Sequence, residues 1–169
     1  MTTATRFDRR MYAVMNNRAG VALYATPARR RAVVGAHVAL TAVAVVAWNA
    51  AVFQAELTGV IVVLAVLLPW MVATGAINGA TRGLLELRGR MLDERQLVER
   101  DRVRALAHRL TGWLLLAGTA LLAVLTVSDM VDPGGLALPL MVAVFAAHRL
   151  MPLWVAGLRV TDEPADDDA

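Results

Sequence analysis

Among the polar side chains that interrupt the long apolar runs of this chain, five are candidates for chemistry: His37, Asn78, Thr111, His148 and Arg149. Each lies in the half of its apolar run that is predicted to be nearer to the cytoplasm. One interpretation is a single intramembrane polar pocket whose imidazoles titrate near pH ~6.5 and sense protons. The other is that each polar group forms a local hydrogen bond close to the helix that carries it.

Arg149 is the most costly of these residues to place, because a guanidinium at mid-membrane is unfavourable by ~2.5–3.5 kcal/mol. No acidic residue lies within the apolar runs, so the sequence offers no ion-pair partner at that depth. In one placement the side chain extends to inner phosphates, and Pro152 ends the deep part of the helix. In a second it faces the other helices and binds backbone carbonyls, Asn78 or Glu86. In a third it coordinates an anionic lipid or ligand.

Several classes of enzyme lack their residues in this sequence. Cysteine is absent, which excludes disulfides and thiolate metal sites. There is no HExxH pair, no Walker glycine loop, no GxSxG elbow and no cluster of carboxylates within an apolar run. A haem held by His37 and His148 would need both at one depth, whereas they differ by about five residues, or ~7 Å. We therefore expect no catalytic residue, no metal site and no cofactor.

Four apolar runs carry the polar residues, and they cover residues 32–53, 57–80, 110–128 and 136–158. Each is about twenty residues long, and at ~1.5 Å per residue a helix of that length crosses a hydrocarbon core of ~30 Å. A membrane β-strand needs only ~9–11 residues of alternating polarity, which these continuous runs do not show. The sequence therefore predicts an all-α integral membrane four-helix bundle.

Apart from Arg149, arginine is confined to alternate flanks of these runs. Residues 1–31 contain seven arginines and residues 81–109 contain eight, while the connections 54–56 and 129–135 contain none. Because basic residues are enriched in cytoplasmic loops, both termini are predicted to be cytoplasmic. The helices then form two antiparallel hairpins in a bacterial inner membrane. The absence of lysine favours a bacterium with a GC-rich genome.

The chain divides into three parts. Residues 1–31 are a basic cytoplasmic segment, residues 32–158 a single transmembrane domain, and residues 159–169 an acidic tail that is expected to be disordered. Two interpretations fit the first part: an amphipathic helix lying on the inner leaflet, or a disordered basic leader. Pro27 is expected to break the chain before the first span.

The connection 81–109 is expected to form a cytoplasmic helical hairpin. Its first arm continues the second span toward Gly89. Its second arm begins at Glu94, since Asp93 and Gln96 match a capping box, and continues into the third span. The charged side chains of this hairpin form a candidate surface for a partner: Arg88, Glu94, Arg95, Glu99, Arg100 and Asp101. A solvated face without a partner is the alternative.

Small and aromatic residues also follow the spans. Gly75, Gly79 and Gly83 repeat every four residues, a spacing that permits close contact between membrane helices. This stripe fits internal packing and a homodimer equally well. Tryptophans near span ends, such as Trp154, are expected in an interfacial belt, whereas mid-span Trp70 is expected in helix packing.

The cytoplasmic connection resembles a recurrent charged loop of small, uncharacterised actinobacterial membrane proteins with four helices. The match consists of an LDERQ segment at residues 92–96 followed by Arg100, Asp101 and Arg102. The resemblance implies a two-hairpin architecture and, in some of those families, association with regulators. It implies no catalytic residue.

These features predict a non-enzymatic integral membrane protein that contacts anionic headgroups and presents residues 81–109 to a cytoplasmic or membrane protein partner. The arginines flank membrane spans, where headgroups attract them, so no nucleic-acid binding is expected. The alternatives are a small transporter or an accessory subunit of a transport complex and, as a second alternative, a lipid-modifying enzyme.

Overall fold

The computed structural model describes residues 5–16, 20–130 and 132–159, and every regular element within those ranges is helical. The long helices are α3 (Pro27–Phe53), α4 (Leu57–Ala80), α5 (Glu94–Val127) and α6 (Pro133–Arg159). The short elements are α1 (Arg6–Met15), α2 (Val21–Tyr24) and a 3₁₀ turn, η2 (Gly89–Met91). Each of the four long helices is long and apolar enough to cross a membrane, as predicted.

The start of α3 differs from the prediction. The helical structure is interrupted just before Pro27, since α2 ends at Tyr24, but Pro27 itself occupies the first turn of α3. Thr26 caps this helix by accepting a hydrogen bond from the Arg29 amide at 3.3 Å. Proline suits this position, since its fixed φ is helical and its missing N–H would have no partner there. The cluster of arginines at 29–31 therefore lies inside the first turns of α3 rather than before them.

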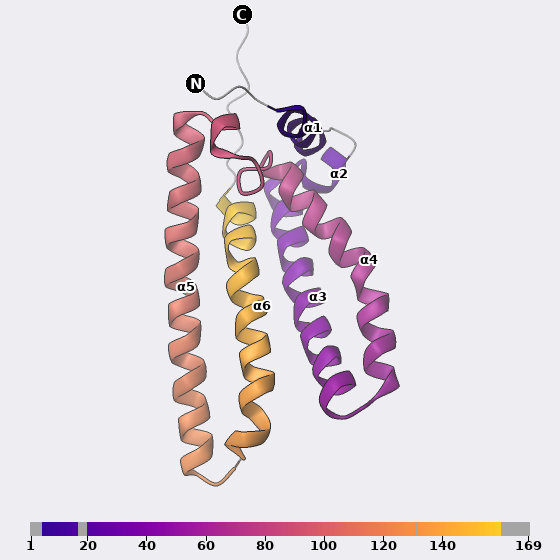
Figure 1. Cartoon of the computed structure of the whole chain (residues 1–169), viewed down its shortest axis with the longest axis vertical. Coiled ribbons are helices and arrows are strands. Elements are labelled where there is room, and N and C mark those ends of the chain that lie inside the picture. Colours follow the sequence, from indigo (N-terminus) through magenta and orange to yellow (C-terminus); the bar gives the residue numbers. More distant parts are fainter. Residues whose placement is uncertain (1–4, 17–19, 131, 160–169) are drawn as a thin grey trace, which may run out of the picture.

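The long helices lie side by side in the order α5, α6, α3, α4 (Figure 1). Helix α3 packs along α4, α5 packs along α6, and α6 joins the two pairs mainly through α3. At Gly59 a Cβ would collide with the α3 backbone at Ala47 and Ala51, so glycine allows close approach there. The starts of α3 and α5 and the ends of α4 and α6 lie at one end, which we call the arginine end (described residues of 5–31, 79–104 and 156–159).

The first arm of the expected cytoplasmic hairpin is not helical. Helix α4 ends at Ala80, not near Gly89, and the chain leaves it through Arg82 and Gly83, whose φ angles are +51° and +71°. These left-handed conformations end an α-helix. The second arm is confirmed: α5 begins at Glu94 and continues without a break to Val127.

The start of α5 follows from its capping box. The Asp93 carboxylate accepts a hydrogen bond from the Gln96 amide at 2.7 Å, and the Gln96 side chain accepts one from the Asp93 amide at 3.1 Å. Together these bonds satisfy two backbone donors that would otherwise have no partner. The predicted position of this helix start is therefore confirmed.

Buried apolar side chains gather toward the arginine end. One cluster joins Val103 and Ala107 of α5 to Val155 and Ala156 of α6, and a second contains Val34, Ile77 and Leu153. Elsewhere the helices expose large apolar side chains, including Leu68 at 70% and Val127 at 85%. Water-soluble proteins rarely expose apolar surface on this scale, whereas a bilayer would cover it.

Residues 6–15 form an amphipathic helix, α1, and its contact with the inner leaflet stays a prediction. Phe7 and Val14 are exposed on its apolar side, and Arg6, Arg9 and Arg10 are exposed on the other. The expected acidic tail, from residue 160 onward, lies outside the described residues.

Candidate functional site: an arginine-lined cleft

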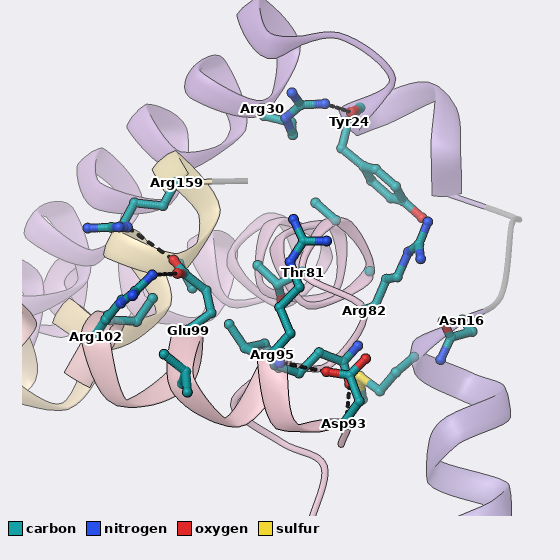
Figure 2. A pocket seen from close by; sticks show the side chains of 18 of the residues that line it. Asn16, Tyr24, Arg30, Thr81, Arg82, Asp93, Arg95, Glu99, Arg102 and Arg159 are labelled. Carbon is teal, nitrogen blue, oxygen red and sulfur yellow. Dashed lines mark hydrogen bonds and ion pairs between the residues drawn. The ribbon is translucent and has the colours of Figure 1, made fainter. Parts of the chain in front are cut away.

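An open cleft of about 1200 Å³ lies at the arginine end, where α2, the start of α3, the end of α4, the first turns of α5 and the last turn of α6 meet. Figure 2 shows its charged lining. The arginines that line it come from four different segments: Arg30, Arg82, Arg95, Arg102 and Arg159. The acids of the lining all come from α5 and its cap: Asp93, Glu94 and Glu99.

One wall of the cleft is built by α2, α3 and the turn after α4. Arg30 is buried, at 7% exposure, and donates a hydrogen bond to the Tyr24 carbonyl at 3.3 Å. The Arg82 side chain projects from the turn that follows α4, and Figure 2 shows its guanidinium directed toward the Tyr24 hydroxyl. Tyr24 also covers Gly79, where a Cβ would lie 3.0 Å from its hydroxyl oxygen. Glycine at 79 thus makes room for the aromatic ring.

The opposite wall is the first part of α5. Glu99 accepts a hydrogen bond from Arg159 at 3.2 Å and lies 4.0 Å from Arg102, so this acid already neutralises charge from two arginines. Asp93 is engaged in the capping box. Arg95 is exposed and extends across the cleft in Figure 2. With five arginines against three acids, the lining carries a net positive charge.

The arginines of this lining suit the binding of anions. Guanidinium groups offer planar pairs of N–H donors that match carboxylate and phosphate oxygens. The described lining contains no histidine, cysteine or serine that could act as a nucleophile or as a base near neutral pH. Among the described residues, no group of three or more potential ligands could hold a metal ion.

Helix α1 is held against the cleft by a buried carboxylate that the sequence analysis did not single out. The Asp8 side chain is 1% exposed and accepts hydrogen bonds from Arg90 at 2.9 and 2.6 Å, while Arg88 lies 3.7 Å away. The side-chain hydrogen bond from Thr5, with further help from Arg90, lowers the pKa of Asp8 to about 2. Asp8 is the only acid among residues 1–31, and a lone acid in an arginine-rich segment could have indicated an ion pair.

His37 lies in a different place, deep among the long helices, and it is fully buried. Its Nδ1 accepts a hydrogen bond from the Trp154 indole at 2.9 Å, and its Nε2 lies 2.9 Å from the Thr74 hydroxyl. An indole can only donate, so the imidazole proton must sit on Nε2 and be donated to Thr74. Thr74 in turn donates to the Trp70 carbonyl at 2.9 Å. His37 therefore links α3 to α4 and α6.

The other four residues of the predicted polar pocket do not join His37 in this network. Thr111 is buried and donates to the Ala107 carbonyl in its own helix, at 2.9 Å, which matches the local interpretation. Asn78 is partly buried, and His148 and Arg149 are exposed on α6. The partners that His37 does have are two tryptophans and a threonine on α4 and α6.

The predictions for Trp70 and Trp154 have different outcomes. Trp70 takes part in helix packing as predicted, with its rings 4.8 Å from the His37 ring and its indole donating to Thr41 at 2.9 Å. Trp154 donates its indole N–H to His37, and its position in an interfacial belt stays a prediction.

The predicted partner surface separates into two groups. Glu94, Arg95 and Asp101 are exposed, as is Arg88, whose guanidinium also lies 5.6 Å from the Phe7 ring centroid. Arg100 instead turns inward and donates to the Leu87 carbonyl at 3.4 Å. Glu99 is used in its ion pairs with arginines.

The predicted glycine stripe does not act as one surface. Gly75 faces open space, Gly79 accommodates Tyr24, and Gly83 lies beyond the end of α4 in a left-handed turn against Met15. Close contacts between helices are made instead at Gly59, as described above, and at Gly157, where a Cβ would lie 2.8 Å from Val34 and 2.9 Å from Ile77.

Comparison of the chain with family models, with curated proteins and with solved structures finds no match. In the described part of the chain, four helices are long and apolar enough to cross a membrane, which is compatible with a multi-pass helical membrane protein.

Proposed function

We propose that this chain is a non-enzymatic protein of the bacterial cytoplasmic membrane that serves as an anchored interaction module. The long helices would cross the bilayer as two antiparallel hairpins, with the arginine end in the cytoplasm. The observation that carries the proposal is the separation of charge: the arginines gather at one end, while the connections at the other contain Glu56, Asp129 and Asp132 and no arginine. Retention of basic residues on the inner side explains such a separation.

The helix lengths fit this placement. Helix α4 has 24 residues, or ~36 Å at ~1.5 Å per residue, which spans a hydrocarbon core of ~30 Å with some tilt. Helix α5 is longer, at 34 residues. If its charged part, up to Arg109, stays outside the core, the remaining stretch to Val127 still covers ~27 Å.

The partner that this geometry favours is anionic. Helix α1 presents Phe7 and Val14 on one side and Arg6, Arg9 and Arg10 on another, which is the pattern of a helix lying in the headgroup layer. Each arginine near an anionic leaflet contributes ~1 kcal/mol. The Asp8–Arg90 pair would hold α1 beside the cleft while α1 lies in the headgroup layer. The resemblance of the LDERQ loop supports a partner on the same side.

Orientation is tested with single cysteines, which the chain otherwise lacks. In intact cells, a membrane-impermeant maleimide should label Ala55→Cys and Gly134→Cys, and should label Glu94→Cys only after permeabilisation. The reverse pattern would overturn the orientation, and labelling of all three sites in intact cells would overturn the membrane placement.

Contact with the leaflet is tested by spin labels in nanodiscs that contain anionic or zwitterionic lipid. A label at Val14→Cys should be accessible to oxygen in the lipid and protected from an aqueous nickel reagent, more so with anionic lipid. The matched control is Ala13→Cys, on the arginine side of α1. Equal aqueous exposure at both positions would reject a helix lying in the leaflet.

A further inference from the structure

We propose that His37 is a proton-controlled latch: its neutral imidazole holds the last turns of α6 against α3 and α4, and uptake of a proton releases them. The latch consists of one buried ring and its partners on two other helices. It goes beyond the proposed function, and it does not depend on which side of the membrane the arginine end faces.

In the closed arrangement the imidazole has no place for a second proton. Its Nδ1 accepts the indole N–H of Trp154 at 2.9 Å, and its Nε2–H is donated to the Thr74 hydroxyl, also at 2.9 Å. A proton added at Nδ1 would turn this acceptor into a donor, and two donors would then face each other, because an indole cannot accept. Protonation of His37 and its hydrogen bond from Trp154 therefore exclude each other.

The other described contacts of the ring offer the added proton no free acceptor. The Thr41 hydroxyl donates to the His37 carbonyl at 2.8 Å and accepts the Trp70 indole N–H at 2.9 Å. Trp70 presents its own ring to the imidazole, at 4.8 Å between centroids. His37 has an exposure of 0%, and a buried charge without a hydrogen-bond partner is costly. Proton uptake therefore requires the packing around Trp154 to open.

The charged side chains of the surrounding helices do not offset this cost. Helix α4 contains no titratable residue between Leu57 and Ala80. Like charges disfavour a further positive charge nearby. Apart from His37, the titratable side chains of α3 and α6 are all basic: Arg29, Arg30, Arg31, His148, Arg149 and Arg159.

Acid should therefore favour the open arrangement. Because the open form takes up the proton and the closed form does not, the closed form loses stability as the pH falls below the ordinary titration range of imidazole, near pH ~6.5. One proton changes the ratio of open to closed form by at most ~10-fold per pH unit. Above that range both forms are neutral, and the latch stays closed.

Pro152 gives α6 a place to bend beside Trp154. Proline has no amide N–H, so the helix lacks one backbone hydrogen bond at this point. The segment that follows contacts α3 and α4 through Leu153 and Gly157, and its last residue, Arg159, lines the cleft. Release of Trp154 would thus move one wall of the cleft.

The first test follows the proton on the ring itself. It uses the full-length chain in nanodiscs with His108→Gln and His148→Gln, two exposed positions, so that His37 is the one histidine left. Nitrogen NMR should show a proton on Nε2 alone above pH ~6.5 and a second proton on Nδ1 in acid. The indole signal of Trp154 should change over the same pH range.

The second test measures the opening with spin labels at Leu158→Cys on α6 and Val72→Cys on α4, which are both exposed. The distance distribution should gain a longer component as the pH falls, and the ratio of long to short distances should rise by up to ~10-fold per pH unit. The matched control is His37→Gln, which keeps one acceptor and one donor but takes up no proton. It should show the short distance at every pH.

Three results would overturn the inference. The ring could gain its second proton while the Trp154 indole signal and the distance stay unchanged. The distance could lengthen in acid equally in the parent and in His37→Gln. The ring could remain singly protonated down to pH ~4.5, two units below its ordinary range. The NMR comparison on the parent decides by itself where glutamine does not fit the site.

Discussion

Replacement of His37 by alanine should destabilise the packing of α6 on α3 and α4 by ~2–4 kcal/mol. Two hydrogen bonds are lost, each worth ~0.6 and at most ~1.7 kcal/mol between membrane helices. The missing ring also leaves a cavity, and large-to-alanine changes in a packed interior cost ~2–5 kcal/mol. The estimate lies below the sum because α6 can shift to fill part of the space.

A double-mutant cycle isolates the hydrogen bond from the cavity. Trp154→Phe keeps most of the aromatic volume and removes the one donor, so alone it should cost ~0.6–1.7 kcal/mol. In the His37→Ala background it should cost much less, because the acceptor is already gone. The free energy of unfolding is measured by steric trapping in bicelles, which does not depend on tryptophan fluorescence. His148→Ala, an exposed histidine on α6, is the control and should stay within ~0.5 kcal/mol of the parent.

The reasoning is refuted if the cycle gives a coupling energy no larger than the ~0.3–0.5 kcal/mol expected for independent sites. His37 and Trp154 would then be neighbours without an energetic link. A cost below ~1 kcal/mol for His37→Ala would further show that the three helices are held together elsewhere.

Three other outcomes follow from the same packing. Because the pKa of Asp8 falls from its usual 3.8 to about 2, its stabilising pairing with Arg90 should persist above pH ~4 and be lost as the pH falls toward ~2. Asp8→Asn should release α1 at neutral pH, which would be seen as faster tryptic cleavage after Arg9 and Arg10. Unchanged cleavage would show that the Asp8–Arg90 pair does not hold α1 in place. Gly157→Val should cost ~1–3 kcal/mol of unfolding free energy by colliding with side chains on α3 and α4, whereas Gly75→Ala, which faces open space, should be neutral; similar losses for both would refute the packing. Arg149→Leu should leave stability intact and make α6 insert more favourably in a translocon assay, and a folding defect would show that the guanidinium binds within the fold.

The sequence was a good guide wherever a local rule governs the backbone. The apolar run at 57–80 coincides with α4, and the Asp93–Gln96 capping box marks the start of α5. Both depend only on neighbouring residues: hydropathy over one helix length in the first case, and two hydrogen bonds within one turn in the second.

Local sequence rules did not predict the backbone where contacts with residues distant in sequence decide its path. The stretch after Ala80 is rich in helix-forming leucines, yet it does not continue α4 as a helix. There Leu87 is buried, and Arg90 pairs with Asp8, 82 residues earlier in the chain. Intrinsic helix preference of a few tenths of a kcal/mol per residue is too weak to oppose such contacts. Gly83, assigned to a helix stripe, serves the turn instead.

The sequence by itself determined the number of long apolar helices and the connections at which the arginines gather, since these follow from composition along the chain. Only the tertiary structure decided the partners of His37, which lie 37 and 117 residues away, and the meeting of arginines from four segments around one cleft. Apolar periodicity shows which residues avoid water, but it does not set the register between helices. Register comes from side-chain shape and from hydrogen bonds such as that of Trp154 to His37.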